Sequence, residues 1–197
     1  MSSKDDMILG LEFHTLTPDR WPDLAKLFGE HGASGGCWCM WWRLSRSQFM
    51  EQRGEGNKRA LKSIVDSGNI PGILAYSEDQ PIGWCAVGPR ETYPTLERSR
   101  LLKRVDDKPV WSVVCFFIAK KFRRKGLTVK LLKTAVDYIR KRGGNILEGY
   151  PVEPKEGQTP DPFAYTGTAS AFRKAGFVEV ARRSETRPIM RYVIKEK

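Results

Sequence analysis

The chain has 197 residues, with 34 Lys and Arg against 23 Asp and Glu, and a formal net charge of +11. Its 40% of apolar residues suffices for a buried core, but no stretch reaches the roughly 18 apolar residues that a membrane span needs. The length favours a single domain over residues 1–197. Because residues 1–10 lack both a basic start and an apolar segment, we expect a cytoplasmic protein with no membrane partner.

The positive charge favours anionic partners, either nucleic acid or a ligand with several phosphates. The basic residues are spread along the chain with a local peak at residues 120–125. Neither a zinc-finger spacing nor an aromatic-and-basic RNA signature occurs in the sequence. Nucleic acid is therefore the less favoured of the two partners.

Apolar periodicity, turn residues and capping signals predict the elements of the first half of the chain. The first two are a strand at 11–16 and a helix with Thr17 as its N-cap that ends at Gly29. A charged helical segment follows at 45–67 and is broken at Gly54 and Gly56. Strands at 72–76 and 81–87 come next, and the long connection 88–108 contains a turn or two of helix at 95–102.

Residues 31–43, HGASGGCWCMWWR, combine flexible glycines with two cysteines and three tryptophans. Cys37 and Cys39 form a C-x-C pair, and the chain lacks the second pair of ligands at the spacing that a structural zinc site needs, so we expect no metal. The two thiols are either reduced side chains in a packed loop or reactive groups near a substrate. The tryptophans either seal one end of the core or line a pocket.

The most informative stretch is an apolar strand at 110–118, a basic turn at 120–128 and an amphipathic helix that continues to 142. The first turn of a helix leaves backbone N–H groups unpaired, and the helix dipole adds partial positive charge there. Gly126 lets the backbone approach a bulky oxyanion, while five Lys and Arg side chains add charge. The turn is therefore either a phosphate site or a solvated basic connection.

The C-terminal part predicts a strand at 145–152, a helix at 164–175 and a closing hairpin of strands at 178–181 and 189–194. Glu148 and Tyr150 share one face of the first of these strands, because alternate strand residues point the same way.

Two motifs in this region resemble the GNAT superfamily of N-acetyltransferases. Arg123 and Gly126 match the family's [QR]-x-x-G-x-[GA] turn, with Thr128 at the last position. The segment YTGTASAFRKAGF is similar to the family's N-x-x-A-x-x-L-Y-x-K-x-G-F, with Phe172 at the usual tyrosine. With PIGWCAV, which resembles the family's third strand, the likeness covers about the last 125 residues.

The resemblance implies an α/β (α+β) fold with a central mixed, mostly antiparallel sheet of about six to seven strands. In that fold the fourth and fifth strands splay apart, and helices cover both faces. The implied activity is transfer of an acetyl group from acetyl-coenzyme A to a primary amine by direct attack in a ternary complex, with no metal. A non-catalytic acyl-coenzyme A sensor is the alternative, because Phe172 cannot protonate a leaving thiolate.

The resemblance also assigns roles. Backbone and side chains of the strand end and the turn are expected to hold the cofactor: Phe116, Phe117, Ile118, Arg123, Arg124, Lys125, Gly126, Leu127 and Thr128. Glu148 is expected as general base or as a structural carboxylate, and Tyr165 as an acid for the thiolate or as a cofactor contact. Trp38, Trp41, Trp42 and Tyr150 are expected to line the acceptor site. The acceptor is a small molecule or a protein, and pairing of C-terminal edge strands would give a homodimer.

Overall fold

A computed structural model of the protein describes residues 10–154 and 165–195. Within these residues seven strands form one sheet in the order β1-β2-β3-β4-β5-β7-β6. The β4–β5 pair is parallel and the other neighbouring pairs are antiparallel. The strands are β1 (Glu12–Thr15), β2 (Gly72–Ser77), β3 (Gln80–Pro89), β4 (Trp111–Ile118), β5 (Ile146–Gly149), β6 (Val178–Arg182) and β7 (Pro188–Val193). The helices are α1 (Trp21–Phe28), α2 (Arg46–Glu51), α3 (Glu55–Asp66), α4 (Pro94–Arg98), α5 (Leu127–Arg140) and α6 (Ala169–Lys174).

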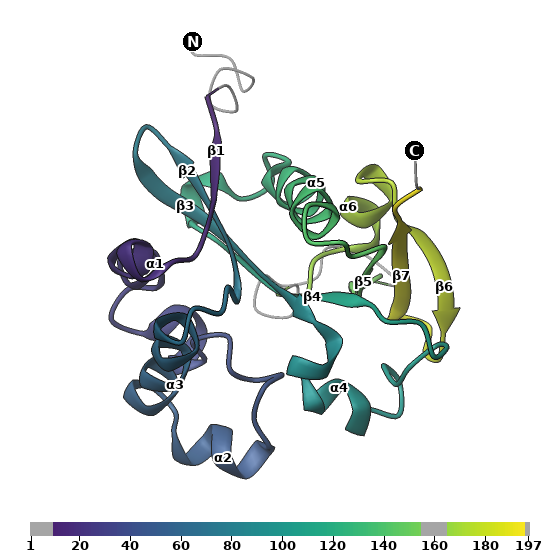
Figure 1. Cartoon of the computed structure of the whole chain (residues 1–197), viewed down its shortest axis with the longest axis horizontal. Coiled ribbons are helices and arrows are strands. Elements are labelled where there is room, and N and C mark those ends of the chain that lie inside the picture. The colour runs from purple at the N-terminus through teal and green to yellow at the C-terminus, as the bar shows by residue number, and fades with distance from the viewer. Residues whose placement is uncertain (1–9, 155–164, 196–197) are drawn as a thin grey trace.

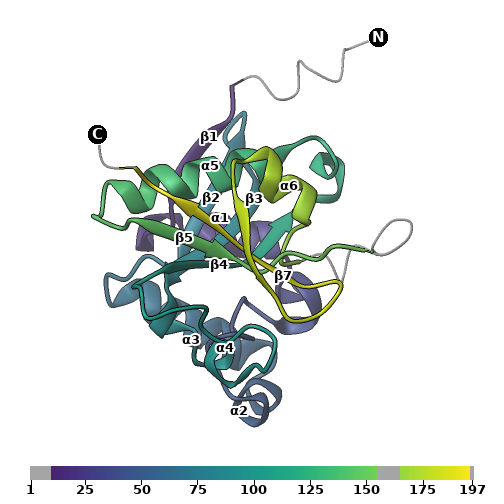
Figure 2. The ribbon, with the colours of Figure 1, turned by 90° about the vertical axis from the view of Figure 1, so that its right-hand side faces the viewer.

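Helices cover both faces of this sheet, as Figure 1 shows. On one face α1 and α3 pack through residues such as Leu24 and Leu61 against Trp84 of β3. On the other face α5 and α6 pack through residues such as Leu131 and Phe172. In Figure 2 helices α5 and α6 lie above the sheet, and α3 lies below it together with α2 and α4. The mixed, mostly antiparallel sheet with helices on both faces confirms the predicted fold class.

Helix α5 is the central helix that the sequence predicts. Its buried residues recur every three or four positions and face the sheet: Leu127, Leu131, Leu132, Ala135, Val136 and Ile139. At 14 residues it is the longest helix in the described part of the chain, and none there is long and apolar enough to cross a bilayer.

Several predicted boundaries differ from the observed ones for local reasons. The Thr17 hydroxyl accepts from the Arg20 guanidinium (3.2 Å) and caps no backbone amide, so a 3-10 turn precedes α1. Gly54 is the N-cap of α3, whereas Gly56 lies inside that helix. The sequence predicts the last helix from Ala164, which lies outside the described residues, but α6 starts only at Ala169. Gly167 has a positive φ of +83°, and Thr168 is extended and caps the helix through its hydroxyl.

The parting of β4 and β5 is the feature of the sheet that makes room for a site. The two strands pair from Trp111↔Leu147 to Val113↔Gly149 and no further, while β4 continues to Ile118. The β3–β4 register shifts by one residue at the same level, where Ala86 pairs with Cys115 and Val87 with Val113. A bulge of this kind bends its strand, so β4 turns away from β5 beyond Val113.

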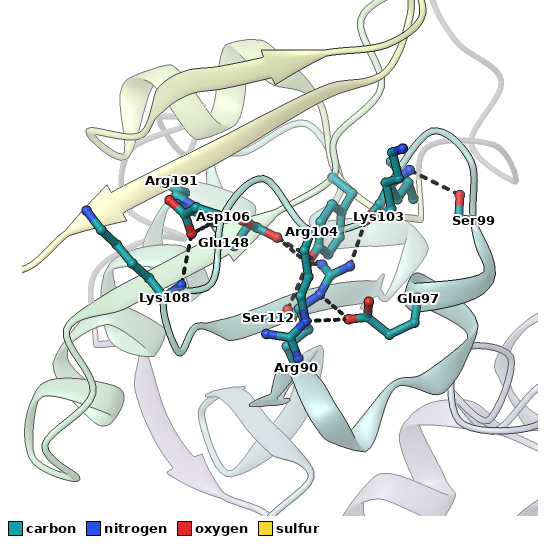
Figure 3. A network of polar contacts seen from close by, with 12 residues as sticks. Arg90, Glu97, Ser99, Lys103, Arg104, Asp106, Lys108, Ser112, Glu148 and Arg191 are labelled. Atoms are coloured by element: carbon teal, nitrogen blue, oxygen red, sulfur yellow. Dashed lines mark hydrogen bonds and ion pairs between the residues drawn. The ribbon is translucent and has the colours of Figure 1, made fainter.

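A buried ionic network lies at the last paired positions (Figure 3). Glu148 is 1% exposed and accepts from Arg90 Nη1 at 3.0 Å and from Arg191 Nε at 2.7 Å. The Tyr150 hydroxyl donates to the same carboxylate at 2.7 Å and lies 2.8 Å from the Ser112 hydroxyl. Both carboxylate oxygens of Glu148 therefore have partners.

The same network fixes the long connection between β3 and β4. Arg90 Nη2 donates to the Leu102 carbonyl at 2.8 Å, and the Arg191 guanidinium donates to Asp106 at 2.6 and 3.0 Å. The connection is thus tied to the sheet beside the point where β4 and β5 part. Arg191 lowers the pKa of Asp106, so this tie contributes stability at neutral pH that is lost as pH falls through the lowered pKa.

We expect Arg90→Met to destabilise the fold by about 3–5 kcal/mol, because it removes one partner of a buried ion pair. Arg104→Met is the matched control: Arg104 pairs with Glu91 and Glu97 at the surface, so its loss should cost under about 1 kcal/mol. Urea denaturation of the two variants measures the difference. If both variants lost a similar, small free energy of unfolding, the network around Glu148 would not be a stabilising contact.

Candidate functional site

The basic turn before α5 has a backbone suited to an anion. Arg124 and Gly126 have positive φ values of +61° and +79°. Such left-handed turn residues before a helix orient successive N–H groups into a concave surface that binds anions. A Cβ at Gly126 would meet nothing within 4 Å, so the approach to its backbone is open. The Arg123 Nε donates to the Ile118 carbonyl at 2.9 Å and ties the turn to the end of β4.

A cavity of about 740 Å³ runs from this turn past the end of β4 to the tryptophan-rich loop. Most sequence-predicted site residues line it: Phe116, Phe117, Ile118, Arg123, Arg124, Gly126, Leu127, Thr128, Tyr165, Trp41 and Trp42. Lys125, Trp38, Tyr150 and Glu148 are not among the residues that line it. Glu148 and Tyr150 belong instead to the buried network at the β4–β5 parting.

The backbone of β4 beside the cavity is partly engaged by the segment before α6. The Phe116 amide donates to the Tyr165 carbonyl at 2.6 Å, across the gap left by β5. Because strand amides alternate in direction, the Ile118 amide points to the same side. A ligand that uses the Phe116 amide must therefore displace the Tyr165 carbonyl, whereas one that uses the Ile118 amide need not.

Tyr165 is the aromatic hydroxyl among the residues that line the cavity. It lies four residues before α6 rather than at the helix start, and its ring is half-buried. Burial, together with the neighbouring Cys115, raises the pKa of its hydroxyl to about 12. Tyr165 is therefore protonated at neutral pH and has a proton to donate.

The tryptophan-rich loop forms the opposite wall and has an unusual backbone. Trp38 and Cys39 adopt positive φ values of +41° and +54°, which non-glycine residues do at a cost in energy. Trp38 is buried, stacks on Trp21 with ring centroids 5.8 Å apart, and supports the wall from behind. Trp41 is 37% exposed and meets Phe49 edge-to-face at 5.1 Å.

Three thiols line this end of the cavity. Cys39 Sγ lies 3.4 Å from Cys115 Sγ and accepts from Trp84 Nε1 at 3.1 Å. The contact with Cys115, followed by burial, raises the pKa of Cys39, and burial raises the pKa of Cys37. All four cysteines are free thiols, and no group of His, Cys, Asp and Glu within residues 10–154 and 165–195 could hold a metal. The geometry thus favours packed thiols over reactive ones.

Several residues that line the cavity were not predicted as site residues from the sequence, among them Phe49, Ser170 and Lys174. Lys174 is the one with a sequence signal, since it matches the lysine of the second motif. Phe49 is on α2, far from the cofactor strand in sequence, and only the tertiary packing brings it to the site.

Comparison with known proteins agrees with this geometry. The model of the Acetyltransferase (GNAT) family matches residues 38–152. No curated protein matches the sequence significantly. Solved structures show the same fold at low identity. A GNAT-family acetyltransferase from Streptococcus agalactiae is 15% identical, with a TM-score of 0.55 over 96% of this chain and 98% of that chain.

Two further structures were determined with ligands. The PaiA N-acetyltransferase from Thermoplasma acidophilum, in complex with coenzyme A, is 16% identical, with a TM-score of 0.52 over 94% of this chain and 99% of that chain. A chain of the NatC complex bound to Gag peptide and coenzyme A is 9% identical, with a TM-score of 0.53 over 94% of this chain and 99% of that chain.

Gly32 tests how the tryptophan wall is supported. A Cβ at Gly32 would lie 2.1 Å from Trp38 Nε1, so Gly32→Ala must push the indole out of place. We expect a loss of about 2–4 kcal/mol, from overpacking and the positive φ together. Gly143→Ala is the control, because Gly143 also has a positive φ (+74°) but meets no atom within 4 Å. Denaturation of both variants measures their free energies of unfolding. Equal losses of free energy would contradict the predicted clash with Trp38.

Proposed function

Since the chain belongs to the GNAT family of acetyltransferases, we propose that it transfers an acetyl group from acetyl-coenzyme A to a primary amine by direct attack in a ternary complex. The observation that carries the proposal is the cavity that joins the basic turn of α5 to the parting of β4 and β5. One end of the cavity suits a pyrophosphate, and the parting exposes strand backbone for an extended arm.

In the proposed complex the turn holds the phosphates. The backbone of residues 124–128 offers N–H groups at the helix N-terminus. The side chains of Arg123, Arg124 and Lys174 add positive charge along the cavity. Thr128 stands where the family has Gly or Ala, and its hydroxyl lies at the first turn, where it adds a donor. The residues present therefore fit a polyphosphate ligand.

The end of β4 positions the thioester in this proposal. The Ile118 amide faces the gap, and the Phe116 amide joins it once the Tyr165 carbonyl moves. Donors aimed at a carbonyl oxygen stabilise the charge that develops on it during attack. Acetyl-coenzyme A supplies the activated acyl group: the amine nitrogen bonds to the acyl carbon as the carbon–sulfur bond breaks.

We assign the proton of the leaving thiolate to Tyr165, which replaces the family tyrosine that is Phe172 in this chain. Phe172 is fully buried in the core and does not line the cavity. Tyr165 lines it and carries its proton up to about pH 12. We infer that Glu148 acts as the structural carboxylate of the buried network, since Arg90, Arg191 and Tyr150 occupy its oxygens.

Release of coenzyme A from acetyl-coenzyme A in the presence of an amine panel tests the proposal. Turnover with any amine supports transfer. Tight coenzyme A binding without turnover across small amines and peptides would favour the sensor alternative instead. Because the protein carries its own thiols, coenzyme A should be quantified by chromatography rather than with a thiol reagent.

Gly126→Glu should abolish cofactor binding, because it brings a carboxylate to the place proposed for the phosphates. We expect coenzyme A affinity to fall at least about 100-fold by charge repulsion. Gly126→Ala carries the same strain at φ +79° without the charge and should stay within about tenfold of the wild type. Calorimetric titration with coenzyme A compares them, and unchanged affinity in Gly126→Glu would show that the phosphates bind elsewhere.

Tyr165→Phe should lower kcat by about 10²-fold or more while changing coenzyme A affinity little, since it removes only the acid. A general acid works while protonated. Because the pKa of Tyr165 is raised to about 12, its deprotonation should not lower the wild-type rate at lower pH. The rate should fall for this reason only as the pH rises through that value. The pH profile of both proteins is the measurement. Equal kcat values in wild type and variant would remove Tyr165 from this role.

A further inference from the structure

The proposed function leaves one end of the cavity for the acceptor. The turn before α5 takes the phosphates, so the wall built by the loop and α2 faces the incoming amine. Cys37, Cys39, Trp41, Trp42 and Phe49 line this end. Two indoles and a phenyl ring give it broad flat surfaces, and the thiols behave as small apolar groups.

Among the described residues, no side chain that lines this end balances a positive charge. Among the described residues that line the cavity, none is Asp, Glu or His, and the charged ones are Arg123, Arg124 and Lys174. Cys37, Cys39 and Tyr165 could be anionic only if they ionised. The contact with Cys115, followed by burial, raises the pKa of Cys39, and burial raises the pKa of Cys37 and of Tyr165. Glu148 is held in its own ionic network.

An ammonium group would therefore enter an apolar wall with no described counter-charge beside it. Burying an unpaired charge is strongly unfavourable, and desolvation disfavours the charged form of an amine. An alkylamine as basic as a lysine side chain is neutral in only about one molecule in 2,500 at pH 7. Direct attack requires that neutral form, and no described carboxylate or imidazole at the cavity is placed to generate it.

Trp42 presents its ring to this wall and not a polar atom. Its indole is 8% exposed, and its Nε1 is buried and has no hydrogen-bond acceptor among the described residues. Because that N–H is inaccessible, it offers no donor to a molecule in the cavity, and the wall stays apolar.

We propose that the acceptor is a flat amine that is uncharged at neutral pH, of the arylamine class. The inference rests on the proposed acetyl transfer and names its second substrate. In the reaction the arylamine nitrogen forms the amide bond as the thioester carbon–sulfur bond breaks, and the proton lost by nitrogen equals the one gained by the coenzyme A thiolate. No base is then needed to prepare the nucleophile.

Two isomeric amines test the charge requirement. 4-Methylaniline and benzylamine have the same atoms and the same ring, but at pH 7 the first is neutral and the second is protonated. With the whole protein and acetyl-coenzyme A, we expect kcat/KM at pH 7 to be at least tenfold higher for 4-methylaniline. The benzylamine rate should rise tenfold per pH unit, while the 4-methylaniline rate stays level. A preference for benzylamine or for a lysine peptide at pH 7 would overturn the inference and leave acetyl transfer intact.

Benzylamine and cyclohexylmethylamine test the flat walls, because they differ in the ring. Their rates are compared per molecule of neutral amine, since cyclohexylmethylamine is the stronger base. We expect benzylamine to react faster, and an equal or higher rate with cyclohexylmethylamine would overturn the requirement for a flat acceptor. If coenzyme A binds but none of these amines is acetylated, the inference is overturned, and the broader panel of amines and peptides decides separately whether acetyl transfer stands.

A variant supplies the missing charge. Cys37 is half-buried at the cavity wall, so Cys37→Asp places a carboxylate there, and Cys37→Ser is the neutral control. We expect the ratio of benzylamine to 4-methylaniline activity to rise at least tenfold in Cys37→Asp relative to Cys37→Ser. Circular dichroism and coenzyme A binding establish that both variants are folded. An unchanged ratio in a folded Cys37→Asp would contradict the argument from charge.

Discussion

The parting of β4 from β5 beyond Val113 is the constraint on which the site depends. A bulge in β4 starts the separation, and the ionic network around Glu148 lies one pair before the last paired position. A buried carboxylate between two guanidinium groups is expensive to bury, yet it leaves few alternative arrangements once all its hydrogen bonds are made. The network therefore fixes where the strands stop pairing, and so where the cavity begins.

On the far side of the parting, α6 completes the site because of its packing against β5. A Cβ at Gly149 would lie 2.1 Å from the Phe172 ring, so the last residue of β5 must be glycine for α6 to sit where it does. Phe172 also meets Phe116 edge-to-face at 6.2 Å. These contacts place Tyr165, which precedes α6, and Lys174, which ends it, at the cavity. The buried ring of Phe172 thus helps to position the Tyr165 hydroxyl at the cavity.

The sequence predicts the sheet, the central helix and the basic turn because each depends on local pattern. Apolar runs, helical spacing and a glycine before a helix are visible without tertiary structure. The surroundings of Glu148 are not predictable in this way. Its partners Arg90 and Arg191 are 58 and 43 residues away, in segments that read as solvated or as an edge strand. Likewise, Phe49 reaches the cavity only because α2 folds against the loop, and no spacing in the sequence indicates it.

The two ends of the cavity differ in charge, and this difference links the proposed cofactor to the proposed acceptor. Arg123, Arg124 and Lys174 attract a polyanion to one end. At the other end, the raised pKa values of Cys37, Cys39 and Tyr165 keep these groups protonated, so they supply no charge to balance a cation. A bound polyphosphate would offset the cations near the turn, but its charge would lie at the turn and not at the tryptophan wall. The acceptor end would then remain apolar and neutral. It would select acceptor amines by their protonation state as much as by their shape.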